Sequence, residues 1–311
     1  LPIENVISIN SQKGFKMIKT YLIVLAFIFT SGCATNSQNT YRKAQVDIVN
    51  HNYAQGIESM REAALDGNMD AQRTLGDMFT YLPGSIIIGR FLEFEHQKVE
   101  AAKWYEKAAD QGDKEAKYQL ALILMSEDYS AWDLETALTL LESLANEDFL
   151  PAHIRLASYY RSVGITRIMI SWIKKAVLLG HPGSQFSLAM HYRFGEGLDQ
   201  DMVKYMELVT LAATNGHPKA QYWLSNLYRS GEGVPADQTL SFEWVQKSAI
   251  QGHPAAMYNY AFKYEKGLGV EKDLEKALNW YQKALSAGIK EARQPARRLI
   301  YDGVPITLTV Q

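Results

Sequence analysis

Residues 229–273 read RSGEGVPADQTLSFEWVQKSAIQGHPAAMYNYAFKYEKGLGVEKD, and this stretch holds one complete copy of a pattern that recurs along the chain. The tripeptide Gly-His-Pro begins at Gly252, near its middle, and the same tripeptide begins at Gly180 and at Gly216. These glycines are spaced by 36 residues, and Gly288 follows after another 36. A fixed period of this length is the sequence signature of a repeat protein.

The period continues toward the N-terminus with two irregularities. The marker position falls on Asp148, 32 residues before Gly180, then on Gly112 after a further 36 and on Gly67 after a further 45. The chain therefore contains about seven units, of which one is shortened and one carries a nine-residue insertion around residues 80–97. A single unit of this size cannot bury its apolar face alone, so the units must stack on one another.

Residue types return at fixed distances from the marker. Apolar or aromatic residues recur eight and twelve residues after it, for example Leu224 and Tyr228, and such spacings place them on one face of a helix. Eight residues before the marker stand four of the six tryptophans, Trp104, Trp172, Trp244 and Trp280. Each unit is therefore predicted to be a helix, a turn at the marker and a second helix, held by packing against its neighbours.

Two further stretches carry a family resemblance. Residues 101–124, AAKWYEKAADQGDKEAKYQLALIL, and residues 277–288, ALNWYQKALSAG, resemble Sel1-like repeats, which are related to tetratricopeptide repeats. The resemblance covers roughly residues 52–303. It implies an all-α fold, a right-handed α-solenoid of antiparallel helix pairs with about seven repeats.

The three Gly-His-Pro histidines, His181, His217 and His253, admit two interpretations. A row of histidines is a candidate metal or catalytic site. The alternative is a turn, because glycine just past a helix end reaches the left-handed conformation and proline fits the first position of the next helix. Helices pack roughly 8 to 10 Å apart, which is awkward for imidazoles that each need a bond of about 2 Å to one zinc ion. We predict turn residues, with no metal site and no cofactor.

A second motif runs from Ser171 to Lys174 and matches the S-x-x-K nucleophile motif of serine β-lactamases. The S-D-N and K-T-G motifs do not follow it, and Trp172 within it occupies the packing position of the repeat. The sequence therefore predicts no catalytic residue, and a hydrolase of the β-lactamase type is the least favoured alternative. Three aspartates that also recur every 36 residues are predicted to cap helix N-termini: Asp201, Asp237 and Asp273.

The N-terminal region reads MIKTYLIVLAFIFTSGCATN from Met17 onward, a lysine followed by a short apolar run and small residues. The run is about half of the ~20 residues that a transmembrane helix needs. Residues 17–32 are therefore predicted to be a signal peptide, and residues 1–16 to lie upstream of the true start.

The sequence Thr30-Ser31-Gly32-Cys33 resembles a bacterial lipobox, in which the cysteine receives lipid, although the motif usually has leucine where Thr30 stands. Cleavage after Ala34 is the alternative. Cys33 is the only cysteine of the chain and is predicted to be the lipid attachment site. By the sorting rule of such lipoproteins, Ala34 rather than aspartate implies an outer-membrane destination.

The rest of the chain divides into three segments. Residues 33–51 are predicted to be a linker, residues 52–303 the solenoid, and residues 304–311 a C-terminal tail. The tail, VPITLTVQ, is strand-like and is predicted to cover the last helix pair, with strand addition to another chain as the alternative. Pro295 lies within the expected final helix, which it should kink or delay.

The overall charge excludes one class of partner. With 32 Lys and Arg against 34 Asp and Glu, the net charge of -2 gives no field that would draw the chain onto phosphates or anionic lipid. No nucleic acid is expected as a partner, and membrane contact is expected only through the lipid anchor.

A solenoid exposes an extended surface that suits protein or peptide partners. By the resemblance to tetratricopeptide repeats, the first helix of each unit should line the concave face. Candidate partner-binding residues on these helices are Lys103, Lys107, Lys174, Lys175, Glu207, Glu243 and Lys247. Candidates in the insertion, which alternatively folds back onto the core, are Ile86, Ile87, Ile88 and Phe91.

These features together predict a non-catalytic Sel1-like scaffold or adaptor for protein partners in the bacterial cell envelope. It would be lipid-anchored in the outer membrane and face the periplasm. The alternative partner is a glycan, because Sel1-like lipoproteins resemble factors of exopolysaccharide export and peptidoglycan maintenance.

Overall fold

The computed structural model of the chain describes residues 35–81, 94–126 and 133–305. This part of the chain forms fifteen α-helices and one short 3-10 helix, and it contains no strand. The chain divides into two compact units, an N-terminal unit, Leu1–Ala152, and a C-terminal unit, His153–Gln311. The division lies in the shortened repeat. The predicted signal peptide, Cys33 and the four apolar candidates of the insertion lie outside the described residues.

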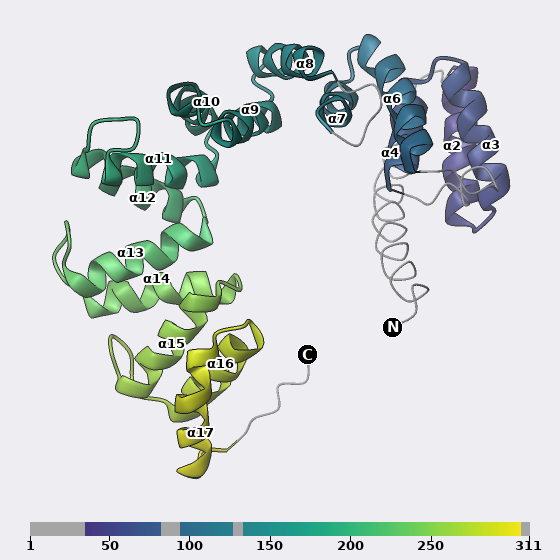
Figure 1. Cartoon of the computed structure of the whole chain (residues 1–311). Coiled ribbons are helices and arrows are strands. Elements are labelled where there is room, and N and C mark those ends of the chain that lie inside the picture. The colour runs from purple at the N-terminus through teal and green to yellow at the C-terminus, as the bar shows by residue number, and fades with distance from the viewer. Residues whose placement is uncertain (1–34, 82–93, 127–132, 306–311) are drawn as a thin grey trace. The chain divides into compact units, whose positions relative to one another are not determined.

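The helices follow one another in pairs within each unit. Those of the N-terminal unit are α2 (Asn36–Val49), α3 (Tyr53–Leu65), α4 (Met69–Tyr81), α6 (Phe94–Asp110), α7 (Lys114–Leu124) and α8 (Leu134–Asn146), and α9 (Leu150–Ser162) contains the division. Those of the C-terminal unit are α10 (Thr166–Leu178), α11 (Pro182–Phe194), α12 (Met202–Thr214), α13 (Pro218–Ser230), α14 (Gln238–Ile250), α15 (Pro254–Lys266), α16 (Leu274–Ser286), η1 (Lys290–Ala292) and α17 (Arg293–Tyr301). Consecutive helices lie side by side from α2 to α8 and from α10 to α17 (Figure 1), which confirms the predicted solenoid of helix pairs. None of the described helices has the length and apolar character needed to cross a bilayer.

Small side chains and buried tyrosines form the packed interior. Most alanines three and four residues before the marker, such as Ala212 and Ala213, are fully buried, so the backbones of neighbouring helices approach closely. Tyr105, Tyr205 and Tyr281 are the largest fully buried side chains of the first helices. The first helix of a repeat thus supplies small side chains that let neighbouring backbones lie close together, and large tyrosine side chains that fill the space between repeats.

The marker residue of each repeat adopts the left-handed backbone conformation, as the turn interpretation requires. Gly180, Gly216 and Gly252 have φ values of 78°, 88° and 88°, and the second helix begins at the proline two residues later. In the third repeat, Asp148 takes this conformation with φ 55°. A side chain in this region is strained, and glycine is not.

We expect Asp148→Gly to stabilise the chain by roughly 1 kcal/mol, because it removes this strain at the helix end. Urea unfolding of the full chain measures the change. The reciprocal variant, Gly112→Asp, places a side chain at φ 94° and should destabilise by a similar amount. Equal stability of all three proteins would show that the turn tolerates either residue.

Two segments differ in detail from the sequence-based expectations. Residues 33–51 were expected to be a linker, but most of them form α2, whose N-cap Thr35 accepts a hydrogen bond from the amide of Gln38. Tyr41 and Ala44 of α2 are buried in the core of the N-terminal unit. At the other end, a 3-10 turn precedes α17, so Pro295 falls in the first turn of a late-starting helix and the predicted delay is confirmed.

Candidate interaction surfaces

The histidines of the Gly-His-Pro turns are helix caps. Nδ1 of His181, His217 and His253 accepts a hydrogen bond from the backbone N–H three residues later, at 3.1, 3.2 and 3.2 Å. A ring nitrogen that accepts this bond carries no proton, so the capping imidazole is neutral. Burial is the main cause that lowers the pKa of each imidazole below its ordinary 6.5. These data confirm the turn interpretation and add a capping role that the sequence analysis missed.

Two of these histidines also join one repeat to the next. His217 stacks on Phe186 with ring centroids 5.1 Å apart, and His253 stacks on Tyr222 at 4.9 Å. The aromatic partner stands six residues after the marker of the preceding repeat. This recurrent aromatic offset was visible in the sequence and could have predicted the stacking.

The S-x-x-K residues do not contact each other in the described structure. Ser171 is exposed, and its hydroxyl donates to the carbonyl oxygen of Ile168 in the same helix at 2.7 Å. Lys174 is exposed one turn further along. The three aspartates at the helix starts cap α12, α14 and α16 through their carboxylates, as predicted.

The tryptophans of the first helices form a recurring pair with a lysine three residues later. The lysine Nζ lies over the indole ring at 4.5, 4.0, 4.1 and 4.3 Å in the pairs Trp104–Lys107, Trp172–Lys175, Trp244–Lys247 and Trp280–Lys283. Trp172 is buried and the other three rings are half-buried. Such cation–π contacts hold a charged group in one position at the surface of the helix. Three of these lysines were predicted as binding residues, and Lys283 was not.

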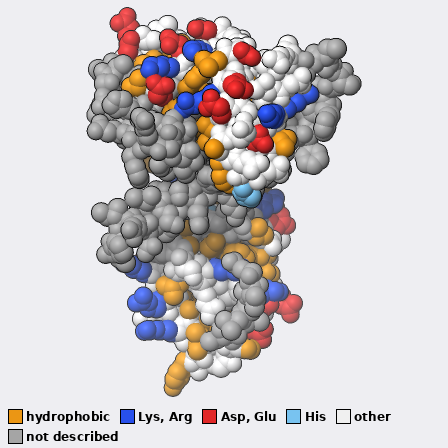
Figure 2. Space-filling model, turned by 90° about the vertical axis from the view of Figure 1, so that its right-hand side faces the viewer, with side chains coloured by type: hydrophobic (Ala, Val, Ile, Leu, Met, Phe, Trp, Pro, Cys, Tyr) orange, Lys and Arg blue, Asp and Glu red, His pale blue; other side chains and the backbone are white. Residues whose placement is uncertain are grey.

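The remaining candidates of the first helices are all exposed. Lys103 on α6 forms an ion pair with Glu100 at 2.7 Å, whereas Glu207 on α12 and Glu243 on α14 have no ion pair in the described part of the chain. The face drawn in Figure 2 likewise carries acidic and basic side chains interspersed. The first helices therefore offer charges of both signs in fixed repeat positions.

The N-terminal unit has a cavity of about 390 Å³ between α6, α7 and α8. Its floor is apolar and includes Leu120, Leu124 and Leu140. Leu140 stands where four other repeats have tryptophan, so the smaller side chain leaves space unfilled. The sequence contained this substitution but gave no measure of the resulting volume.

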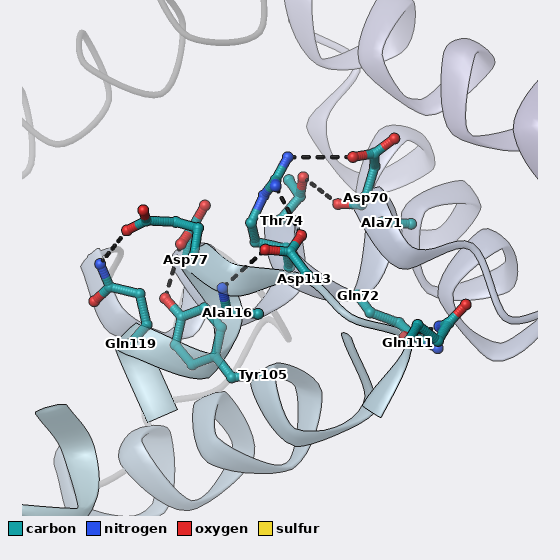
Figure 3. A network of polar contacts seen from close by, with 12 residues as sticks. Asp70, Ala71, Gln72, Thr74, Asp77, Tyr105, Gln111, Asp113, Ala116 and Gln119 are labelled. Carbon is teal, nitrogen blue, oxygen red and sulfur yellow. Dashed lines mark hydrogen bonds and ion pairs between the residues drawn. The ribbon is translucent and has the colours of Figure 1, made fainter. Parts of the chain in front are cut away.

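A polar network joins α4, α6 and α7 in the same unit (Figure 3). Arg73 forms ion pairs with Asp70 at 3.2 Å and with Asp113 at 2.7 Å, and the Asp113 carboxylate also caps α7. Nearby, the Tyr105 hydroxyl donates a hydrogen bond to Asp77 at 2.8 Å. Burial raises the pKa of the Asp77 carboxyl from 3.8 to about 6, against the opposing effects of Tyr105 and Arg73.

We expect Asp77→Asn to stabilise the protein at neutral pH by roughly 1 to 3 kcal/mol. The folded state holds a proton on Asp77 more tightly than the unfolded state does, so wild-type stability falls as pH rises from about 4 to about 6. An asparagine oxygen still accepts the Tyr105 hydrogen bond but does not titrate. Urea unfolding across this range should show a flatter pH profile for the variant, and parallel profiles would contradict the assignment.

In the described residues, no group of three or more His, Cys, Asp or Glu side chains is arranged to hold a metal ion. What the geometry presents instead is a set of surfaces: the lysine–tryptophan pairs of the first helices, and the cavity between α6, α7 and α8. Both are candidate surfaces for binding other molecules, because a repeat protein exposes an extended surface.

Comparison with known proteins places these repeats in a family. The family model described as Sel1 repeat matches residues 95–113, 182–217, 218–253 and 254–289. No curated protein matches the chain. The crystal structure of a protective antigen present in uropathogenic Escherichia coli strains, which displays an SLR fold, is 26% identical with a TM-score of 0.61. That match covers 86% of this chain, and the chain spans only 57% of the antigen.

Two smaller proteins are also similar. A Sel1 repeat protein from Oxalobacter formigenes is 37% identical over 40% of this chain and 95% of its own, with a TM-score of 0.40. Cysteine-rich protein B of Helicobacter pylori is 19% identical over 40% of this chain and 90% of its own, with a TM-score of 0.33. The four repeat matches, together with the likeness to the antigen with the SLR fold, decide the assignment: the chain belongs to the Sel1 repeat family, whose members are generally non-catalytic scaffolds for protein–protein interaction.

Proposed function

We propose that the chain is a lipid-anchored scaffold of the bacterial cell envelope that binds partner proteins in the periplasm through the first helices of its repeats. The binding role is supported by one observation, the row of lysine ammonium groups held over tryptophan rings. In the C-terminal unit these are Lys175, Lys247 and Lys283, at 4.0, 4.1 and 4.3 Å from the ring centroids. A cation that is already positioned loses less side-chain entropy when it meets a carboxylate. The row therefore suits proteins with acidic binding segments.

The scaffold role is tested by replacing these three lysines with glutamine. The triple variant should lose a partner that crosslinking and mass spectrometry recover reproducibly from intact cells of the source bacterium. A matched control replaces three exposed lysines that lie outside the row, Lys219, Lys272 and Lys290, and so removes the same charge. Equal recovery with both triples would contradict binding through the row, and the lack of any reproducible protein partner would contradict the scaffold role.

The envelope location rests on the sequence of the N-terminal region. Cys33→Ser should release the protein from the membrane fraction, because no acyl chain can then be attached. Ala34→Asp should keep the protein in membranes but move it from the outer to the inner membrane. Unchanged fractionation of Cys33→Ser would rule out the lipid anchor, and unchanged sorting of Ala34→Asp would rule out the outer-membrane assignment.

A further inference from the structure

The cavity between α6, α7 and α8 has two carboxylates without a partner on its rim. Glu106 and Asp110 are exposed and form no ion pair among the described residues. The two rim lysines are already paired, Lys103 with Glu100 at 2.7 Å and Lys117 with Glu147 at 3.9 Å. An incoming group should therefore be apolar at its tip, to suit the leucine floor, and cationic at its base, to meet the carboxylates.

A group of this chemistry is present on the C-terminal unit. From residue 149 to residue 195 the chain has six Lys and Arg and no Asp or Glu. Near the end of α10, the Leu178 side chain is 86% exposed. Lys174 and Lys175 stand four and three residues earlier, on the same face of the helix, and neither pairs with a carboxylate of its own unit. Leu178 is thus an exposed leucine flanked by two cations that form no ion pair among the described residues, and the ammonium of Lys175 lies over the Trp172 ring at 4.0 Å.

We propose that this chain associates with a second copy of itself by inserting Leu178 into the cavity between α6, α7 and α8 of that copy. Lys174 and Lys175 then face the rim carboxylates Glu106 and Asp110. The contact joins two different surfaces of the chain, the end of α10 in one copy and the cavity in the other. It goes beyond the scaffold role, because the partner is the protein itself and the receiving site lies outside the lysine row of the C-terminal unit.

Two other exposed aliphatic side chains at the same repeat position lack this combination. Ile250, at the same repeat position in α14, is 67% exposed, but the carboxylate of Glu243 lies on the same helix face as Lys247. Leu65, at the corresponding position in α3, is 71% exposed and is flanked by Glu62 and Asp66, which the acidic rim would repel. Of these three side chains, only Leu178 has two cations and no carboxylate beside it on its helix face.

Sedimentation of the full chain tests the proposal directly. The wild type should associate reversibly between about 1 and about 100 µM, the range expected of a small interface. Leu178→Asp, Lys174→Glu with Lys175→Glu, and Glu106→Lys with Asp110→Lys should each weaken the association at least tenfold. Ile250→Asp is the matched control and should associate like the wild type. All the changed side chains are exposed, so each variant should remain folded, which circular dichroism checks.

The decisive experiment mixes the two charge-reversed variants, the one changed at the end of α10 and the one changed at the rim. Each variant alone is expected to associate at least tenfold more weakly than the wild type. In the mixture, the acidic end of α10 in one variant matches the basic rim in the other, and the unchanged end of α10 in the second variant matches the unchanged rim of the first, so the association should return. A wild type that stays monomeric at the highest concentration would overturn the proposal. An Ile250→Asp variant that associates as weakly as Leu178→Asp would also overturn it, because the contact would then not depend on the end of α10. A mixture that does not associate would overturn it as well, because the charged groups would then not meet between two copies.

Discussion

Replacing Gly269 with alanine should destabilise the C-terminal unit by about 3 to 5 kcal/mol, a larger loss than at any other turn position. Gly269 has φ 74°, and a Cβ atom there would overlap the carbonyl oxygen of Gln238 at the start of α14. The obstacle is backbone, which cannot rotate away as a side chain can. Because each repeat contacts only its neighbours, the loss should appear in α14, α15 and α16 first. Hydrogen exchange of their backbone amides, together with urea unfolding, measures it.

Gly267, two residues earlier in the same loop, is the matched control. Its φ is 68°, but the nearest atoms that a Cβ would meet are 3.6 Å away. Gly267→Ala should therefore cost only the backbone strain, about 1 kcal/mol. Equal stability of the two variants would show that the close approach of the loop to α14 does not contribute to the stability of the C-terminal unit.

Acidification should weaken the C-terminal unit through its three histidine caps. Protonated Nδ1 cannot accept the helix N–H, so the caps of α11, α13 and α15 are lost together. The pKa of each imidazole is below 6.5 in the folded chain, so the caps contribute fully above that pH and the contribution falls as pH drops through the lowered values. At about 1 kcal/mol per cap, the unit should lose roughly 3 kcal/mol between about pH 7.5 and about pH 5.

The triple variant His181→Asn, His217→Asn and His253→Asn isolates this effect. Asparagine caps a helix as well as histidine does here, and it does not titrate in this range. The first repeat already uses such a cap, because the Asn68 side chain accepts from the amide of Ala71 at 2.8 Å. Thermal unfolding at both pH values should show a smaller acid loss in the variant. The same loss in both proteins would show that other groups cause it.

Much of the fold followed from the spacing of a few residues. Glycine and proline around the marker predicted where α11, α13 and α15 would begin, because both residues restrict the backbone independently of the rest of the chain. Pro295 likewise predicted the late start of α17. Helix α2 was missed because it precedes the first marker glycine, and its amphipathic pattern alone did not distinguish it from a linker.

The candidate surfaces were less predictable. The lysines at positions 107, 175 and 247 were recognised as polar positions of the first helices, but their placement over a tryptophan depends on side-chain rotamers that a sequence does not specify. The role of His217 as a cap depends on which ring nitrogen meets the backbone. The cavity beside Leu140 depends on how far neighbouring helices close over a smaller side chain, which is a property of the packed structure.

Site-specific photocrosslinking in intact cells tests the central claim most directly. A photoreactive residue is placed in turn at the same position of four first helices, Ser171, Glu207, Glu243 and Asn279, and, for comparison, at exposed positions of second helices, Ser158, Lys219 and Phe262. If the first helices bind partner proteins, the first set should give adducts of discrete mass and the second set should not. Adducts from the second set alone, or from neither set, would contradict the account.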